Sequence, residues 1–310
     1  MGTNRRPIAG DCSHLPFSRG EAQRLQERND EVEKKVPFDP DRPALIELRK
    51  LAGSPVLAWP PKLPPRDPRG VESAATFECW KKASASTVGI AGSYFSLKAG
   101  GRVACHSHLE ARLLRYFEMC PFVVEIRTQY PSWDRAKYLR YSRLGWRMPK
   151  NAIMTIDFML TLQIPGYPFL VYHGVSGKPA ALVELPGVKK RHVRELEQLW
   201  SWASTHEVMT DATMSDREFR NYRRLYSYMY RTEDIKGHTL AAAEFARALK
   251  ATTAQGSLDR VIRMISKRFG YSFMFGYRLF GLAHFLGYLQ WDHRHAVAPE
   301  LPMMILREMQ

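Results

Sequence analysis

Three carboxylates on separate predicted elements could together hold a divalent metal ion. Glu110 lies on the apolar stripe of a predicted helix, seven residues before Phe117. Asp157 lies in a predicted strand over 152–162, and Glu184 lies in a further short strand pattern. A buried carboxylate costs free energy unless it is paired or binds a metal. Three of them converging beside a lysine would form a site suited to hydrolysing a phosphodiester.

The composition indicates an acidic partner. The chain has 310 residues and a formal net charge of +15, which favours nucleic acid over a membrane surface as that partner. It contains no hydrophobic run long enough to span a bilayer and no signal-like N-terminal segment. Its four cysteines form no C-x-x-C pair and no disulfide-dense pattern, which fits a reducing environment. We therefore expect a cytoplasmic protein.

The segment from Arg127 to Lys150 has the composition of a nucleic-acid contact. It holds seven basic residues against one acid, Asp134, and tyrosine and tryptophan side chains are interleaved with them. Basic groups neutralise phosphates and aromatic faces stack on bases, so we favour a nucleic-acid surface over a long solvated hairpin. The candidate contacts are Arg127, Arg135, Lys137, Arg140, Arg143, Arg147 and Lys150.

The chain divides into three predicted parts. Residues 1–74 form an N-terminal extension whose proline-rich stretch, 54–70, predicts a stiff connector. Residues 75–206 predict an α/β domain with a mixed sheet flanked by helices. Its predicted strands span 123–126, 152–162, 169–173 and 180–185, and a helix follows over 188–204. Residues 207–310 predict a mostly helical, winged-helix-like domain, with helices over 216–230, 239–250, 257–269 (Ser257 as N-cap) and 272–288.

The order of these motifs resembles the restriction-endonuclease fold and, more narrowly, the TnsA-like endonuclease subunits of heteromeric cut-and-paste DNA transposases. HSHLEARLL is similar to that family's Ser-x-x-Glu helix, with Ser107 and Glu110 as the matching residues. EIRTQYP (125–131) is similar to the family's next strand, which ends in Gln–aromatic–Pro. TIDFML supplies the strand aspartate, Asp157.

The resemblance continues into the helical part and implies a function. The stretches 208–228 and 284–292 are similar to the family's C-terminal domain, and the resemblance covers residues from about 85 to 300. It implies Mg²⁺-dependent hydrolysis of double-stranded DNA, with Mn²⁺ able to substitute, that nicks the 5′ ends of a transposon. It also implies two protein partners in the bacterial cytoplasm, a DDE-type transposase subunit and an AAA+ ATPase regulator.

The chain departs from the family at the third catalytic element. There the family has an acid or Gln, one further residue and then Lys, commonly followed by Pro. The stretch VELP (183–186) has the proline, but Leu185 stands where the lysine belongs. We expect the next helix to supply the lysine, because Lys189, Val193 and Trp200 share one helical stripe. Lys189 is therefore the candidate that orients the attacking water.

Two other classes of protein remain open. A catalytically decayed, DNA-binding adaptor would keep its function when Asp157 is substituted. A stand-alone repair or restriction nuclease would cut DNA without partners. The basic excess between Asn221 and Arg278 fits either a contact with nucleic acid or acidic protein, or an ordinary solvated surface.

Overall fold

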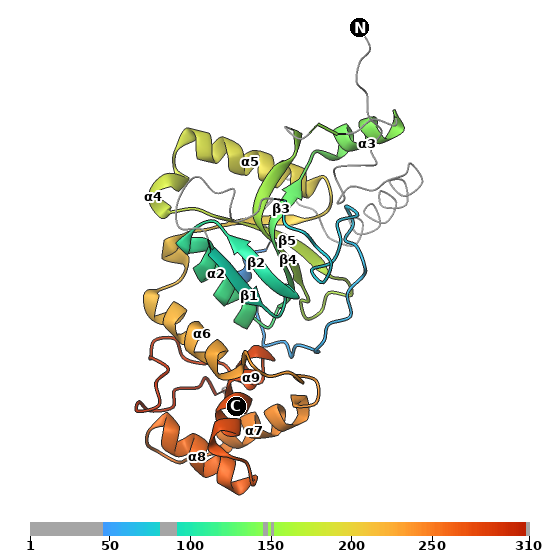
Figure 1. Ribbon diagram of the computed structural model, residues 1–310. Coiled ribbons are helices and arrows are strands. Elements are labelled where there is room, and N and C mark those ends of the chain that lie inside the picture. The colour runs from blue at the N-terminus through green and yellow to red at the C-terminus, as the bar shows by residue number, and fades with distance from the viewer. Residues whose placement is uncertain (1–45, 81–91, 145–147, 150–151, 308–310) are drawn as a thin grey trace. The chain divides into compact units, whose positions relative to one another are not determined.

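The computed structural model describes residues 46–80, 92–144, 148–149 and 152–307 (Figure 1). Residues 1–45 of the predicted N-terminal extension lie outside them. The chain forms two compact units, and each is described by itself. Unit 1 comprises the described parts of Met1–Leu51, Leu63–Ala111 and Glu125–Asp211, and unit 2 those of Ala52–Lys62, Arg112–Val124 and Ala212–Gln310.

Unit 1 contains a mixed four-stranded sheet, as predicted for this part of the chain. The strand order is β3–β4–β5–β6. Strand β4 pairs antiparallel with β5, and β5 pairs parallel with β6. A separate antiparallel hairpin is formed by β1 (Gly92–Ser96) and β2 (Gly101–Cys105). The sheet strands are β3 (Val123–Ser132), β4 (Met154–Leu162), β5 (Val171–Gly177) and β6 (Thr205–Met209).

Burial of the central strands explains their sequences. Nearly every residue of β4 and β5 is buried, as expected for strands covered on two faces. Strand β4 is mostly apolar, whereas β5 also buries the polar residues His173 and Ser176. Helix α5 (Pro186–Trp200) packs on the sheet through Leu199, which is fully buried. Gly174 of β5 makes this approach possible, because a Cβ there would lie 2.3 Å from Leu199 Cδ1.

The strand predicted over 180–185 is wrong. Residues Ala180–Val183 form the short helix α4, and the strand before them runs to Gly177 rather than ending at 173. Gly177 pairs with Met209 of β6, and Lys178 N–H donates to the Met209 carbonyl at 2.9 Å. The next residue is a proline, which has no N–H to continue the ladder, so the chain leaves the sheet there.

Unit 2 is mostly helical, and the four predicted helices are confirmed. Serine residues begin three of them: Ser215, Ser257 and Ser272 each accept a hydrogen bond from a backbone N–H in the first turn. The helices are α6 (Asp216–Met229), α7 (Thr239–Ala251), α8 (Leu258–Arg268) and α9 (Phe273–Phe285). No helix in the described part of the chain combines the length and apolar character needed to cross a membrane.

The proline-rich stretch packs against neighbouring structure at both of its ends. In unit 2, Leu57 N–H donates to the Leu286 carbonyl at 2.9 Å, and Trp59 meets Phe285 edge to face. In unit 1, Asp67 closes a tight turn by accepting from the N–H groups of Arg69 and Val71. The stretch therefore contributes a buried turn to the α/β unit besides acting as a connector.

The close contact at Gly174 gives a prediction about stability. Gly174→Ala should lower the free energy of unfolding by about 1–3 kcal/mol, because the added methyl overlaps the buried Leu199 side chain. Gly187→Ala is the matched control, since a Cβ at that position of α5 meets nothing within 4 Å. Urea denaturation of both variants measures the difference, and equal midpoints would show that α5 can shift without cost.

Candidate active site

Glu110 is held in the first turn of helix α2 (His108–Met119). Ser107 Oγ accepts from Glu110 N–H at 3.1 Å, and the Ser107 hydroxyl donates back to Glu110 Oε1 at the same distance. His106 N–H donates to Glu110 Oε2 at 2.8 Å. This reciprocal arrangement resembles a capping box, so the same local sequence that starts the helix also fixes the carboxylate. The side chain is only 6 % exposed.

Gln129 of β3 provides a further donor to Glu110. Its Nε2 lies 3.2 Å from Glu110 Oε2, and the residue is buried. Its φ of 49° is in the left-handed region, which is rare for a residue with a side chain and is often found at functional sites. Sequence reasoning assigned Gln129 no role in the site. The available signal was the Gln–aromatic–Pro ending of its strand.

Asp157 enters the site from the central strand β4. The antiparallel ladder pairs Phe158 with Val175, which brings Asp157 beside the end of β5. There Gly177 N–H donates to Asp157 Oδ2 at 2.9 Å. The carboxylate is 9 % exposed, so both of the principal predicted ligands are buried polar groups.

The two carboxylates interact with each other electrostatically. Burial raises the pKa of Glu110 to about 7 from an ordinary value of 4.5, and the Asp157 charge adds to this rise. Burial also raises the pKa of Asp157. The hydrogen bonds to His106 and Ser107 oppose the shift at Glu110, as the one to Gly177 does at Asp157, but they do not cancel it. A pair of buried, like-charged groups with raised pKa values is typical of functional sites.

Lys178 is the lysine whose charge acts on both carboxylates. Its positive charge lowers the pKa of Glu110 and of Asp157, against the rise that burial causes. It follows β5 directly and precedes Pro179. This is the Lys–Pro order of the resembled family, which residues 185–186 lack because Leu185 precedes the proline there. Ser176 stands two residues before it, where the resembled family has an acid or Gln. That serine concealed the match in the sequence, although Lys–Pro after an apolar strand was a usable signal.

Glu184 and Lys189 lie elsewhere, on the surface. Their side chains are 78 % and 55 % exposed and form an ion pair of 2.5 Å with each other. Leu185 is 49 % exposed and precedes the first turn of α5, so it occupies no strand position. Within the described part of the chain, no three His, Cys, Asp or Glu side chains are grouped so that they could hold a metal ion. The predicted grouping of Glu184 with Glu110 and Asp157 is therefore wrong.

The inward stripe of α5 also differs from the prediction. Val193, expected to face inward with Lys189, is 52 % exposed. Glu195 and Leu199 are the buried residues of this helix. Leu199 makes the apolar contact with the sheet, and Glu195, four residues before it, lies on the same face of the helix. That face is therefore the buried one, and the face that carries Lys189 and Val193 is not.

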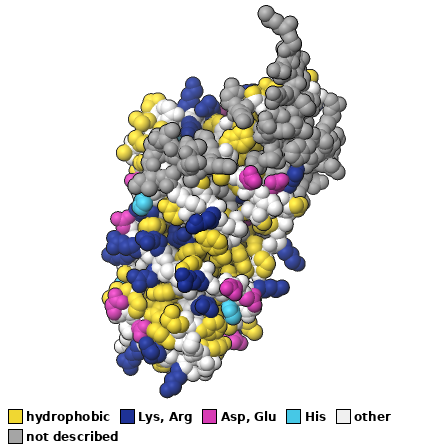
Figure 2. All heavy atoms as spheres, viewed as in Figure 1, with side chains coloured by type: hydrophobic (Ala, Val, Ile, Leu, Met, Phe, Trp, Pro, Cys, Tyr) yellow, Lys and Arg dark blue, Asp and Glu magenta, His cyan; other side chains and the backbone are white. Residues whose placement is uncertain are grey.

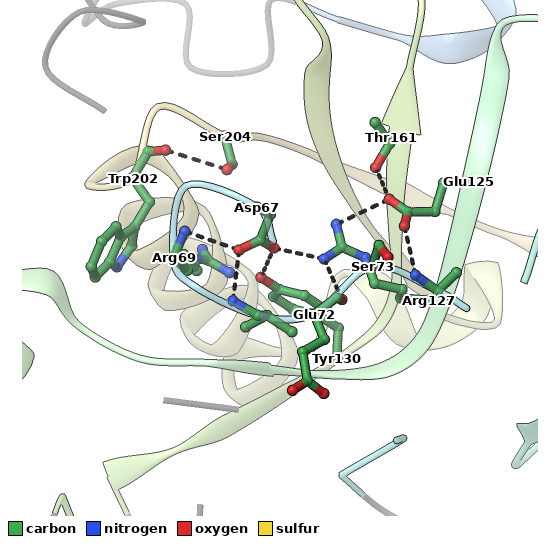
Figure 3. A network of polar contacts seen from close by, with 12 residues as sticks. Asp67, Arg69, Glu72, Ser73, Glu125, Arg127, Tyr130, Thr161, Trp202 and Ser204 are labelled. Carbon is green, nitrogen blue, oxygen red and sulfur yellow. Dashed lines mark hydrogen bonds and ion pairs between the residues drawn. The ribbon is translucent and has the colours of Figure 1, made fainter. Parts of the chain in front are cut away.

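The predicted contact of Arg127 with nucleic acid is contradicted by its burial. Arg127 lies in a buried polar network (Figure 3), where its Nη1 donates to Asp67 Oδ2 at 2.8 Å and its Nη2 lies 3.6 Å from Glu125 Oε2. The hydroxyl of Tyr130 donates to the same Asp67 oxygen, and that of Thr161 to Glu125. The paired charges fix the proline-rich turn to β3, so Arg127 has a structural role.

Three aromatic residues of the predicted nucleic-acid segment belong to the core. Tyr130, Trp133 and Tyr138 are at most 1 % exposed and pack with Ile156 and Trp202. They cannot stack on bases without unfolding the unit, so that part of the prediction is wrong.

Helix α3 (Arg135–Arg143) carries the basic residues of this segment that remain at the surface. Arg135 is half-buried and donates from Nη1 to the Ser201 carbonyl at 3.1 Å. Lys137, Arg140 and Arg143 are exposed. The last two candidates, Arg147 and Lys150, lie outside the described residues.

Unit 2 also presents basic side chains. On the face shown in Figure 2, Lys and Arg side chains over α6–α9 are spread among hydrophobic and uncharged ones. Exposed basic residues on these helices include Arg220, Arg223, Arg224, Arg260, Arg263 and Lys267. This distribution fits both interpretations of the basic excess between Asn221 and Arg278, a contact with nucleic acid or acidic protein and an ordinary solvated surface.

The carboxylate pair predicts how charge and pH affect stability without divalent ions. Asp157→Asn removes one like charge and keeps an oxygen that can accept from Gly177 N–H. The pKa of Glu110 in the folded protein, about 7, is higher than the ordinary value of 4.5 that applies to the unfolded chain. The contribution of Glu110 to the free energy of unfolding is therefore fully present below about pH 4.5 and is lost as the pH rises through about 7. We expect Asp157→Asn to raise the thermal midpoint in a chelator, and by more at about pH 8 than at about pH 5.

Calorimetry at both pH values measures this effect. Adding Mn²⁺ should raise the midpoint of the wild type and leave that of Asp157→Asn unchanged. Glu197→Gln, an exposed change on α5, is the control. If Asp157→Asn lowers the midpoint equally at both pH values, repulsion between the Glu110 and Asp157 carboxylates does not limit stability.

The exposed face of α3 predicts a change in salt dependence. Lys137→Ala with Arg140→Ala should weaken binding to all DNA duplexes alike and flatten the salt dependence by about one unit of slope per lost phosphate contact. A matched double variant is Lys50→Ala with Lys189→Ala, because each of these exposed lysines is already paired with a glutamate. Fluorescence anisotropy over a salt series measures both. A slope equal to the wild-type value would make α3 an ordinary solvated helix.

Comparison with known proteins adds no relative to this description. No protein-family model matches the chain, and no curated protein matches it either. The proposed chemistry therefore rests on Glu110, Asp157 and Lys178 themselves, and on the strands and helix that hold them.

Proposed function

We propose that this chain is a metal-dependent DNA endonuclease with Glu110, Asp157 and Lys178 as its catalytic residues. The observation that carries the proposal is a pair of buried carboxylates with raised pKa values beside one lysine. This combination has a high electrostatic cost unless a cation is bound between the acids. The formal charge of +15 supports a nucleic acid as substrate.

The order of elements supports a restriction-endonuclease-like core. A helix supplies Glu110, β4 supplies Asp157, and the antiparallel neighbour β5 ends directly before Lys178. Ser176, Gly177, Lys178 and Pro179 have the spacing of the family's third element, with serine in place of the acid or Gln. In this proposal unit 2 is the winged-helix-like C-terminal domain.

The donor set fits Mg²⁺ or Mn²⁺. Both side chains offer only oxygen atoms, and Mg²⁺ is commonly held by one or two carboxylates while it keeps several waters. Glu110 and Asp157 would hold the ion. When bound, it would polarise a phosphoryl oxygen and favour deprotonation of a water molecule.

The chain's own residues orient the reacting groups. Gln129 Nε2 and His106 N–H hold the Glu110 carboxylate, and Gly177 N–H holds that of Asp157. Lys178 would orient the attacking water and stabilise negative charge that develops on the phosphate. The water oxygen forms a bond to phosphorus and gives up a proton, the bond from phosphorus to the leaving oxygen breaks, and that oxygen takes up a proton.

The resemblance gives the proposed biological setting. The substrate would be the transposon end, nicked on its 5′ side, and the other strand would be cut by a DDE-type transposase subunit. An AAA+ ATPase regulator would be the second partner. The alternative of a catalytically decayed adaptor rested on the lysine missing at 185, and the presence of Lys178 after β5 supports an active site over that alternative.

Substituting Lys178 and Lys189 one at a time tests which of these lysines belongs to the catalytic site. Lys178→Ala should lower the rate of DNA nicking by about two to three orders of magnitude, because one electrostatic contact in the transition state is lost. DNA binding and the Mn²⁺-induced thermal shift should remain. Nicking of a supercoiled plasmid that carries the transposon ends, with the partner subunits present, measures the rate.

Lys189→Ala and Lys190→Ala are the controls, and both should nick at the wild-type rate. Normal nicking by Lys178→Ala would remove that residue from the mechanism. Nicking by the wild type without partners would favour a stand-alone nuclease. Unchanged transposition by Asp157→Asn would favour an adaptor.

A further inference from the structure

A second network of buried charges lies beside the carboxylate pair in unit 1. Its centre is Glu195 of α5, whose side chain is fully buried. Arg191 Nε donates to Glu195 Oε1 at 2.7 Å, and Ser176 Oγ donates to Oε2 at 2.8 Å. His206 Nε2 lies 3.4 Å from Oε2 and 3.2 Å from Ser176 Oγ.

Glu195 is an anchored anion and is not free to hold a metal. Burial alone would raise its pKa, but hydrogen bonds from His206 and Arg191 and their charges bring the pKa down to about 2. Both carboxylate oxygens are already occupied by donors from Ser176, Arg191 and His206. A carboxylate satisfied in this way stabilises the cation that it pairs with.

Arg191 is fixed on one side and open on the other. Its Nε is held by Glu195, and its Nη2 donates at 3.1 Å to the carbonyl of Thr155, two residues before Asp157 on β4. Nη1 has no hydrogen-bond partner among the described residues and is not enclosed, and the side chain is 38 % exposed. The hydrogen bond to Thr155 holds the guanidinium against the strand that carries Asp157, and the charge of Arg191 lowers the pKa of that carboxyl.

These contacts leave an oriented N–H edge next to the proposed reaction site. A guanidinium whose other nitrogens are fixed loses little freedom when it binds a further oxygen. Phosphate oxygens are strong acceptors for such an edge, and the bond is charge-assisted. Two cations, Lys178 and Arg191, would then flank Asp157.

We propose that Arg191 contacts a phosphate of the bound DNA strand and that Glu195, held by Ser176 and His206, is its positioning residue. The inference deepens the proposed function and rests on it. Under this assignment Ser176 does not replace the acid or Gln of the resembled family as a ligand. It holds Glu195, which orients Arg191.

The test uses the full chain with a fluorescein-labelled DNA duplex and Ca²⁺ in place of Mg²⁺. Arg191→Gln removes the charge and keeps an amide that can donate to Glu195. It should flatten the salt dependence of binding by about one unit of slope. Lys189→Ala, on the same helix and already paired with Glu184, should leave the slope unchanged. The thermal midpoint confirms that each variant is folded.

A second readout uses cleavage and chemical rescue. With Mg²⁺, Arg191→Ala should nick about a hundredfold more slowly than the wild type, and added guanidinium ion should restore part of the rate. Glu195→Gln should lower the rate while the salt slope stays at the wild-type value, because the charge of Arg191 remains. A lost fold would not be restored by guanidinium at concentrations below those that denature.

The two proposals fail in different ways. A folded Arg191→Gln variant with the wild-type slope would overturn the phosphate contact, and Arg191 would only neutralise Glu195. If the wild type nicks and the Arg191 variants nick equally fast, the inference alone is wrong. If the wild type does not nick under any divalent ion, the nuclease proposal fails, and the slope still decides whether Arg191 contacts DNA.

Discussion

The burial of two acidic side chains, one from helix α2 and one from strand β4, is the constraint around which unit 1 is organised. Among the residues that the structure describes, neither Glu110 nor Asp157 has an ion pair that cancels its burial, and the pKa of each is raised. The groups around them include donors and cations, among them Gln129 in an unusual backbone conformation and Lys178 at the end of β5. The nearby charge of Glu195 adds to the rise in the pKa of Asp157. Uncompensated burial of this kind costs free energy, and it is the feature on which the proposed metal site rests.

Other buried acids in the same unit show that burial alone does not mark the site. Glu195 is more deeply buried than either, yet its pKa is about 2 because Arg191 and His206 pair with it. Asp67 is also buried and is paired with Arg127. The distinguishing property of Glu110 and Asp157 is therefore the lack of compensation, which depends on what each side chain contacts.

The basic segment shows how composition can mislead about location. The composition predicts a surface for nucleic acid at Arg127 and the aromatic residues after it, and the structure buries Arg127, Tyr130, Trp133 and Tyr138. A strand buried on both faces accepts an arginine when the carboxylates of neighbouring elements pair with it. The partner Asp67 is 60 residues away in sequence, so no local pattern could have indicated the ion pair.

The sequence alone determined the features that depend on neighbouring residues. The apolar stripe from Glu110 to Phe117 predicted the helix that forms α2, and Ser257 predicted the start of α8, because caps and helical stripes depend on residues within one or two turns. The tertiary structure decided which chain segment pairs with β4. Two short apolar runs could have done so, and only the sheet contacts with β4 and β6 select 171–177. That choice places Lys178, and not Lys189, directly after the strand that pairs with β4, because pairing energies come from partners distant in sequence.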